Sequence, residues 1–194
     1  MRLTTGGLVV LLIAVAAATT APSAPGQKVV ACSSQLRDLK TLSDPGRSLI
    51  FFRPRSTTIA AINRRPIPSA TPTVRSRGFE RHVWRVAAQI TQYKLEPDGA
   101  IHLILFDANA YMVAEMPSPA CLTTTTRERQ TLIDVRRTFE TRCGVATPTW
   151  RNLGAVVSIS GVGLWDYPRA QKGHARNYAE LNPVTGIRFV AGCA

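Results

Sequence analysis

The alternation of apolar and polar positions is clearest in three consecutive segments of the chain. Within residues 82–94, the apolar side chains Trp84, Val86, Ala88 and Ile90 occupy every second position, which is the period of a β-strand with one buried face. In residues 101–107 (IHLILFD), Ile101, Leu103 and Leu105 share one face, and residues 111–116 form the third segment. The turn-forming stretches 97–99 (Pro-Asp-Gly) and 108–110 separate the three segments. The pattern predicts a three-stranded antiparallel meander.

The period then changes to that of a helix over Thr126–Arg142. Leu132, Val135 and Phe139 share one helical face, with charged residues opposite them. The first residue of this segment is a threonine that can cap the helix, and Gly144 stands where a helix would end. We therefore expect one amphipathic helix after the meander.

Two further strands are predicted at 155–164 and 186–190. Gly161 and Gly163 lie inside the first of them and indicate a bend or bulge. The order of three strands, one helix and two strands over residues 79–194 is typical of an OB-fold. The predicted fold class is therefore mainly β, a small OB-like closed five-stranded barrel with one helix between strands 3 and 4. Small barrels of other topology remain open.

The first residues resemble an export signal. A short basic start (Met1, Arg2) precedes an apolar run from Leu8 to Ala18, which is too short to span a bilayer comfortably. We predict a signal peptide at 1–18, a secreted or cell-surface protein, and no stable membrane span after cleavage. An uncleaved anchor is the alternative, whereas the thirteen residues between the apolar run and Cys32 argue against lipidation at that cysteine.

Residues 19–78 form a predicted basic, proline-rich arm. They carry ten basic and two acidic side chains, whereas residues 79–194 carry thirteen and ten, so the arm holds most of the net charge of +12. Within the arm, 33–42 is amphipathic, 48–52 is a possible strand, and 57–63 is a possible helical turn. Such an arm can dock on an anionic polymer or act as a solvated tether.

Four cysteines in an exported chain predict two disulfides with three possible pairings. We favour Cys121–Cys143 and Cys32–Cys193, because the second bond would tie the arm to the last strand. No Cys-x-x-Cys spacing or Cys/His cluster supports a metal site, and we expect no cofactor.

Several segments resemble an uncharacterised family of exported bacterial proteins, found mainly in high-GC Gram-positive lineages. The matching pieces are LKTLSDP (39–45), YKLEPDGAIHLILFD (93–107), MVAEMPSPAC (112–121), and SGVGLWD with NYAELNPVTGIR (within 160–188). The resemblance implies a secreted barrel domain behind a proline-rich arm, and no established activity, cofactor or partner. Its members often carry His at the positions of Arg169 and Asn182, so this chain lacks two potential ligands or proton carriers.

The polar connection between the last two predicted strands, Asp166–Asn182, holds most of the candidate chemistry. OB-folds use this loop to grip ligands. Basic, amide and aromatic side chains there would contact an anionic group or stack on a base or sugar. The candidate ligand-binding residues are Trp165, Tyr167, Arg169, Lys172, Arg176, Asn177 and Tyr178. The alternative is a solvated connection whose aromatic residues cap the barrel.

The sequence offers fewer candidate catalytic residues than candidate ligand-binding residues. Asp166, His174 and Glu180 could bind a divalent metal for phosphodiester hydrolysis. No serine lies in a nucleophile-elbow context and no glycine-rich phosphate loop is present. His102 lies on the face of its strand opposite Leu103, and we predict a partly buried, hydrogen-bonded histidine covered by the arm.

These patterns favour an exported, non-catalytic binding module. Its expected target is an anionic polymer, either a nucleic acid or a wall or surface polysaccharide, or else a surface partner. A metal-dependent phosphodiesterase or nuclease on the same barrel is one alternative. A structural piece of a cell-surface assembly is the other.

Overall fold

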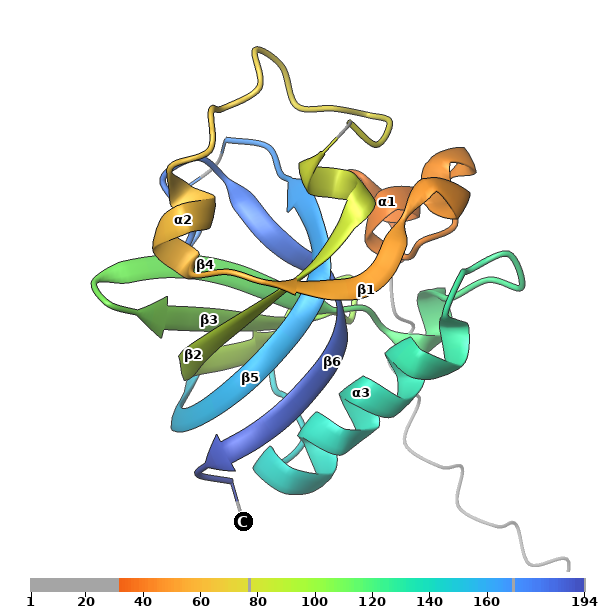
Figure 1. The fold of residues 1–194 in the computed structure, drawn as a ribbon. Coiled ribbons are helices and arrows are strands. Elements are labelled where there is room, and N and C mark those ends of the chain that lie inside the picture. The colour runs from red at the N-terminus through yellow and green to blue at the C-terminus, as the bar shows by residue number, and fades with distance from the viewer. Residues whose placement is uncertain (1–31, 77, 169, 194) are drawn as a thin grey trace, which may run out of the picture.

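The computed structural model describes residues 32–76, 78–168 and 170–193 (Figure 1). The predicted signal peptide (1–18) and the predicted ligand residue Arg169 lie outside the described residues. Within the described part of the chain, no helix combines the length and apolar character that a membrane crossing requires.

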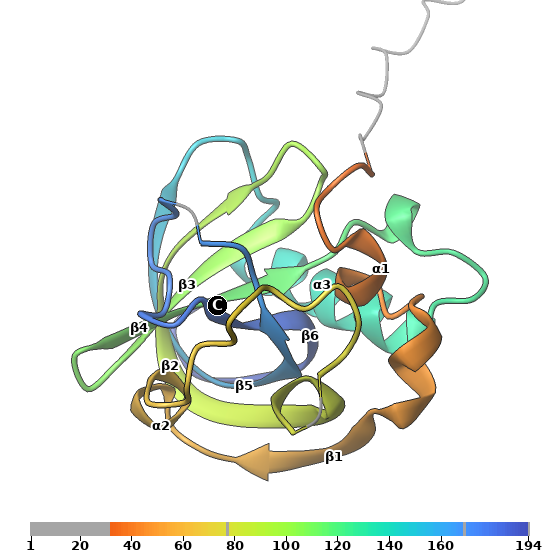
Figure 2. The ribbon, with the colours of Figure 1, turned by 90° about the horizontal axis from the view of Figure 1, so that it is seen from above.

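The fold is mainly β, as predicted, and its strands form one mixed sheet. The strands are β1 (Phe51–Ser56), β2 (His82–Leu95), β3 (Ile101–Asp107), β4 (Ala110–Met116), β5 (Arg151–Trp165) and β6 (Ala179–Ala191). Their order is β1-β2-β3-β4-β6-β5, and β5 also pairs with β2. Hydrogen bonds therefore connect β2 to β6 in a ring, which is visible end-on in Figure 2. Within this ring only β4 and β6 run parallel.

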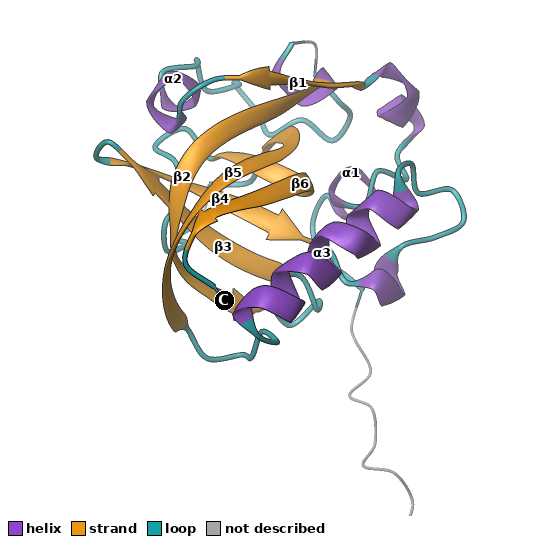
Figure 3. Ribbon diagram, turned by 60° about the horizontal axis from the view of Figure 1, so that its bottom comes forward, coloured by secondary structure: helices purple, strands orange, loops and turns teal. Residues whose placement is uncertain are grey.

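The helices lie outside the ring. They are α1 (Arg37–Lys40), α2 (Ile59–Asn63) and α3 (Arg129–Cys143), with 3₁₀ turns at Pro45–Leu49, Phe79–Arg81 and Pro119–Cys121. Figure 3 shows α3 lying along β6. Its buried Phe139 meets the ring of Tyr93 edge-on with centroids 5.1 Å apart, so the apolar face of the helix completes the main core.

Alternation within the strands places the main core inside the ring. In β2, for example, Val86, Ala88 and Ile90 are buried while the residues between them are exposed. Leu103 and Leu105 of β3 belong to the same cluster of buried apolar side chains. The period-2 pattern of the sequence therefore identified the buried face correctly.

The glycine-marked irregularity in β5 is confirmed. The register between β5 and β6 shifts at Gly161 and again before Gly163. A Cβ atom on Gly163 would lie 2.5 Å from the carbonyl oxygen of Phe79, so any side chain at this position would force the backbones apart. The strand bends where a neighbouring backbone comes close, which is a common use of glycine in sheets.

The described residues of the predicted arm pack against the sheet. β1 pairs in parallel with β2, and the buried Ile59 and Ile62 of α2 join the main core. Arg75 is 3% exposed and donates to Asp44 Oδ1 at 2.8 Å. The helical turn predicted at 57–63 is present as α2, whereas the strand predicted at 48–52 begins only at Phe51, because Pro45–Leu49 forms a 3₁₀ turn.

Three sequence predictions need correction. β6 begins at Ala179 rather than at residue 186, so the end of the predicted loop is strand. The long helix begins at Arg129. The hydroxyl of Thr126 does not cap it, because that oxygen accepts a hydrogen bond from the backbone N–H of Thr123. The position before the helix is Glu128, whose side chain makes no capping bond.

The favoured disulfide pairing was also wrong. All four cysteines are paired, but the bonds are Cys32–Cys121 and Cys143–Cys193. The reason is the long helix α3, which stands between Cys121 and Cys143 and is about 22 Å long at 1.5 Å per residue. The helix keeps those two cysteines apart and places Cys143 next to Cys193, after the end of β6. Cys32, just before α1, lies next to Cys121, at the start of the connection that leads into α3.

Candidate functional site

A group of polar side chains is buried on the outer side of the ring, where β3, β4 and β6 meet. His102 and Glu115 are directly paired across β3 and β4 and point away from the core face. Glu180 and Asn182 of β6 join them, and each of the four side chains is at most 4% exposed. Lys40 of α1 contacts Glu115, and Gln171 of the β5–β6 loop contacts His102, so both segments help to bury the group.

Lys40 of α1 lies above these carboxylates and compensates their charge. Its Nζ is 3.2 Å from Glu115 Oε2 and 3.5 Å from Asp166 Oδ2. Asn182 Nδ2 donates to Glu115 Oε2 at 2.7 Å and to Glu180 Oε2 at 3.2 Å. We call Lys40, Glu115, Asp166, Glu180, Asn182 and His102 the buried polar cluster.

His102 connects this cluster to the β2–β3 turn and the β5–β6 loop. Its Nδ1 is 3.5 Å from Glu115 Oε1, 3.4 Å from Glu96 Oε1 and 3.1 Å from Gln171 Nε2. The histidine is 1% exposed. The predicted buried, hydrogen-bonded histidine is thus confirmed, with Lys40 of the arm among the side chains near it.

The two glutamates of the cluster have opposite protonation preferences. Burial alone would raise the pKa of Glu115, but the positive charge of Lys40 and the hydrogen bond with His102 hold that pKa below its usual range. Burial, and then the negative charge of Glu115, raises the pKa of Glu180 well above its usual range. The cluster therefore stabilises one ionised and one protonated carboxyl group side by side.

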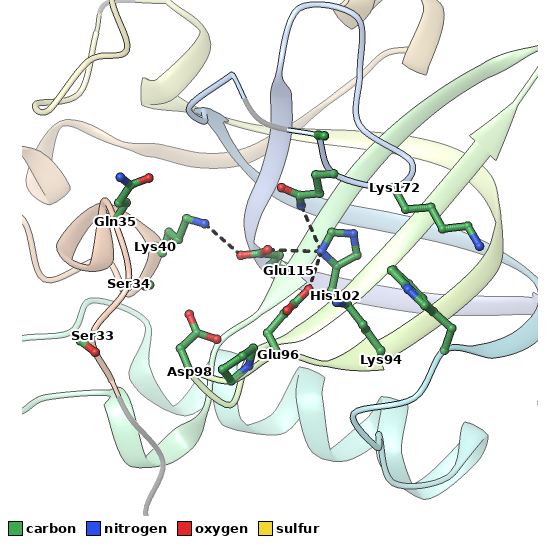
Figure 4. A pocket seen from close by; sticks show the side chains of 14 residues that line it. Ser33, Ser34, Gln35, Lys40, Lys94, Glu96, Asp98, His102, Glu115 and Lys172 are labelled. Carbon is green, nitrogen blue, oxygen red and sulfur yellow. Dashed lines mark hydrogen bonds and ion pairs between the residues drawn. The ribbon is translucent and has the colours of Figure 1, made fainter.

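A cavity of about 610 Å³ opens above His102 and Glu115 (Figure 4). Its walls come from α1 and the segment before it, the β2–β3 turn, Trp150, and the β5–β6 loop. The charged or titratable side chains that line it are Lys40, Lys94, Lys172, Glu96, Asp98, Glu115 and His102. A second cavity of about 500 Å³ adjoins it and shares Gln171 and Lys172.

Trp150 supplies the aromatic surface of the main cavity. It is partly exposed, whereas the other two tryptophans are at most 8% exposed. Lys94 Nζ lies 4.9 Å and Lys172 Nζ 5.4 Å from the centre of its ring, within the range of cation–π attraction. The ring of His102 meets it edge-on at 5.3 Å.

The structure divides the predicted ligand-binding residues between two places. Lys172 lines both cavities just described. The other members of the set that line a cavity gather around a separate one of about 260 Å³, beside residues 67–71 of the arm; they are Trp165, Tyr167, Asn177 and Tyr178. Arg176 is exposed.

Asn177 has a structural role. Its side chain is buried and its Nδ2 donates to the carbonyl oxygens of Ile62 at 2.8 Å and Arg65 at 3.1 Å. These bonds fasten the arm to the β5–β6 loop. Trp165 is buried against Phe79, with ring centroids 4.9 Å apart, and so belongs to the core.

The three catalytic candidates are placed in different environments. Asp166 and Glu180 are in the buried polar cluster, whereas His174 is exposed and stacks on Tyr178 at 5.3 Å. Among the residues that the structure describes, no three His, Cys, Asp or Glu side chains are arranged to hold a metal ion.

Sequence reasoning missed Lys40, Glu115, Glu96 and Trp150. One signal was available for Glu115, because a charged residue interrupts an otherwise apolar run in β4 and faces His102 across the predicted hairpin. Lys40 lies in the short helix α1, and Trp150 lies in the connection directly before β5. No local pattern there indicates which element they will meet.

The comparisons with known proteins add little. No protein-family profile and no curated protein sequence matches this chain, so the resemblance to exported bacterial proteins stays a prediction. A solved structure described as "putative aspartyl-tRNA synthetase" from Leishmania major Friedlin is similar, with 10% sequence identity and a TM-score of 0.43. The match covers 71% of this chain and 21% of that chain. A similarity at this level supports no inference about function.

Proposed function

We propose that this protein is an exported, non-catalytic module that binds a polysaccharide in the cavity between the β2–β3 turn and the β5–β6 loop. The observation that carries the proposal is the lining of this cavity. It combines a partly exposed tryptophan, Trp150, with lysine ammonium groups and carboxylates.

The ring of strands is, in this proposal, an OB-type barrel. Its support is the connectivity: the first ring strand pairs with the second and the fourth, and the third runs parallel to the fifth. The helix α3 stands between the third and fourth ring strands. OB-folds bind oligosaccharides and oligonucleotides between the loops that join strands 1–2 and 4–5. Those loops are here Glu96–Ala100 and Asp166–Tyr178, and both line the main cavity.

The chemistry of the lining favours a sugar over a nucleic acid. Glu96, Asp98 and Glu115 place three carboxylates beside the three lysines of the cavity, so the lining carries no net positive charge to hold the closely spaced phosphates of a nucleic acid. Carboxylates accept hydrogen bonds from sugar hydroxyl groups, and ammonium groups donate to them. The mixed lining therefore suits a polymer rich in hydroxyl groups.

Export is part of the proposal. Disulfides persist in oxidising compartments, and both pairs of cysteines in this chain are bonded. Together with the predicted signal peptide, they favour a location outside the cytoplasm.

Tryptophan fluorescence and calorimetry test the proposal. Trp150 lines the cavity, so its emission should change when soluble polysaccharides such as dextran, glucomannan or hyaluronan are titrated into the protein. Calorimetry should show binding of at least one of them. Trp150→Ala should weaken that binding about tenfold or more, in the range of a lost stacking contact.

The control is Val145→Ala, an exposed position that lines none of the cavities described above. Its binding should equal that of the unmodified protein, and circular dichroism should show that both variants are folded. If every polysaccharide fails to bind while single-stranded DNA binds, the proposal is wrong.

A further inference from the structure

Lys172 occupies a special position between the two cavities. Of the three lysines that line the main cavity, Lys40 pairs with Glu115 and Asp166, and Lys94 pairs with Glu96 at 3.1 Å. Lys172 makes no ion pair within the described residues, and its ammonium group lies over Trp150. Since it lines both cavities, its charge is available at their junction.

The residues on either side of Lys172 lie against β3. Before it, Gln171 Nε2 lies 3.1 Å from His102 Nδ1. After it, Gly173 has a positive φ of 77°, and a Cβ atom there would lie 2.5 Å from Ile104 Cγ2. The loop therefore approaches β3 so closely that only glycine fits, and Lys172 projects from a segment held at two points.

The lining of the main cavity holds three lysines and three carboxylates, and its ion pairs leave the ammonium group of Lys172 uncompensated at the junction. Lys94 balances Glu96, and Lys40 balances Glu115 at the base of the cavity. Asp98 accepts a hydrogen bond from the backbone N–H of Ala100, on the side of the turn. Figure 4 shows Lys172 and Lys94 on one side of the cavity and Asp98 with Lys40 on the other.

We propose that the ligand is an acidic polysaccharide, and that Lys172 binds a sugar carboxylate at the junction while neighbouring sugar units lie in the two cavities. This inference rests on the function proposed above and specifies its substrate class. One unpaired ammonium group matches a polymer whose acidic units alternate with neutral ones. A denser polyanion would bring its additional charges against the carboxylates of the lining.

Hyaluronan and its methyl ester provide a matched pair of probes, because they share a backbone and differ in the charge of the uronic acid. Isothermal titration calorimetry at low salt should give about tenfold tighter binding of hyaluronan, which corresponds to one ion pair in a partly enclosed site. The difference should shrink at high salt, because the ion pair lies near the surface. Polyglycerol phosphate serves as a third probe, to separate a carboxylate preference from a phosphate preference.

Three variants test whether Lys172 causes the tighter binding of hyaluronan. Lys172→Met should abolish the difference in affinity between hyaluronan and its ester, mainly through weaker binding of hyaluronan. Lys172→Arg should retain most of the preference. Arg129→Gln removes an exposed charge at the start of α3, away from both cavities, and should change neither affinity.

The outcomes separate this inference from the proposed function. If hyaluronan and its ester bind equally well, or if Lys172→Met keeps the preference, Lys172 does not select the acid although the module still binds polysaccharide. Tighter binding of polyglycerol phosphate than of hyaluronan would overturn the assignment to a carboxylate. If no polysaccharide binds, both proposals fail.

Discussion

At the scale of single residues, the protein balances several charges within a small buried volume. Asn182 donates to both Glu115 and Glu180, which holds the two carboxyl groups close together. The positive charge of Lys40 offsets the negative charge of Glu115 and, in part, that of Asp166. A further ionised carboxylate in this low-dielectric site would repel the first two, so Glu180 favours its protonated form.

This arrangement predicts a specific pH dependence of stability. Because the folded state raises the pKa of Glu180, it holds one more proton than the unfolded state once the pH exceeds the usual glutamate value of about 4.3. The free energy of unfolding should therefore fall as the pH rises through this window, by at most about 1.4 kcal/mol per pH unit from this group. Glu180→Gln mimics the protonated form and should remove that decline.

Urea unfolding of both proteins between about pH 5 and 8 measures the effect, since this interval lies above the unfolded pKa. The variant should become progressively more stable than the unmodified protein toward the alkaline end. Glu128→Gln, at an exposed position, is the control and should follow the unmodified protein. Parallel curves for Glu180→Gln and the unmodified protein would contradict the protonated state of Glu180.

At the scale of elements, β5 pairs with a different strand on each side. It pairs with β2 along most of its length and with β6 on its other side. The strand must therefore bend, and the register shifts at Gly161 and Gly163 provide the bend. The absence of side chains at these positions lets the Phe79–Arg81 turn and β6 approach the strand closely.

Gly163→Ala should destabilise the protein by about 1–3 kcal/mol, the usual effect of overpacking a filled interior. Its new Cβ atom would lie 2.5 Å from the Phe79 carbonyl oxygen, a backbone atom without freedom to move aside. Gly186→Ala is the matched control, because its nearest contact would be an ordinary 3.8 Å from Ser160 Cβ. Chemical denaturation should show a change within about 0.5 kcal/mol for the control. Equal stability of both variants would show that β5 has room for the methyl group.

At the scale of the whole molecule, two disulfides fasten the ends of the described chain to its body. Cys32–Cys121 joins residues 89 positions apart and holds the arm beside the main cavity. Cys143–Cys193 joins residues 50 positions apart and holds the end of β6 against α3. The first bond also secures α1, which carries Lys40 over the buried polar cluster.

Loop-closure entropy predicts about 4–5 kcal/mol of stabilisation from each bond. The paired substitutions Cys32→Ser with Cys121→Ser, and Cys143→Ser with Cys193→Ser, should each lower the free energy of unfolding by an amount of this order. Mass spectrometry of a non-reduced tryptic digest tests the pairing directly, because arginines separate all four cysteines. A linked peptide containing Cys121 and Cys143 would contradict the pairing described here.

The order and type of the elements could be predicted from the sequence because they depend on local patterns. Alternation in 82–94 and 101–107 reports which side of a strand is buried, and Pro97-Asp98-Gly99 favours a tight turn whatever surrounds it. The hydrogen bond from Glu96 N–H to the Ala100 carbonyl closes that turn as expected. The position of His102, buried opposite the core face, followed from the same alternation.

The sequence indicated Lys172, Asp166 and Glu180 as site residues, but only the tertiary structure decided which side chains they meet. Lys40 and Glu115 are 75 positions apart, and they meet because α1 packs on the outer side of β4. Trp150, Glu96 and Lys172 come from three separate connections that closure of the strand ring brings to one cavity. The disulfide pairing depends likewise on the direction in which the rigid helix α3 runs. A periodic pattern reports the environment of a residue, but it carries no information about which distant segment provides that environment.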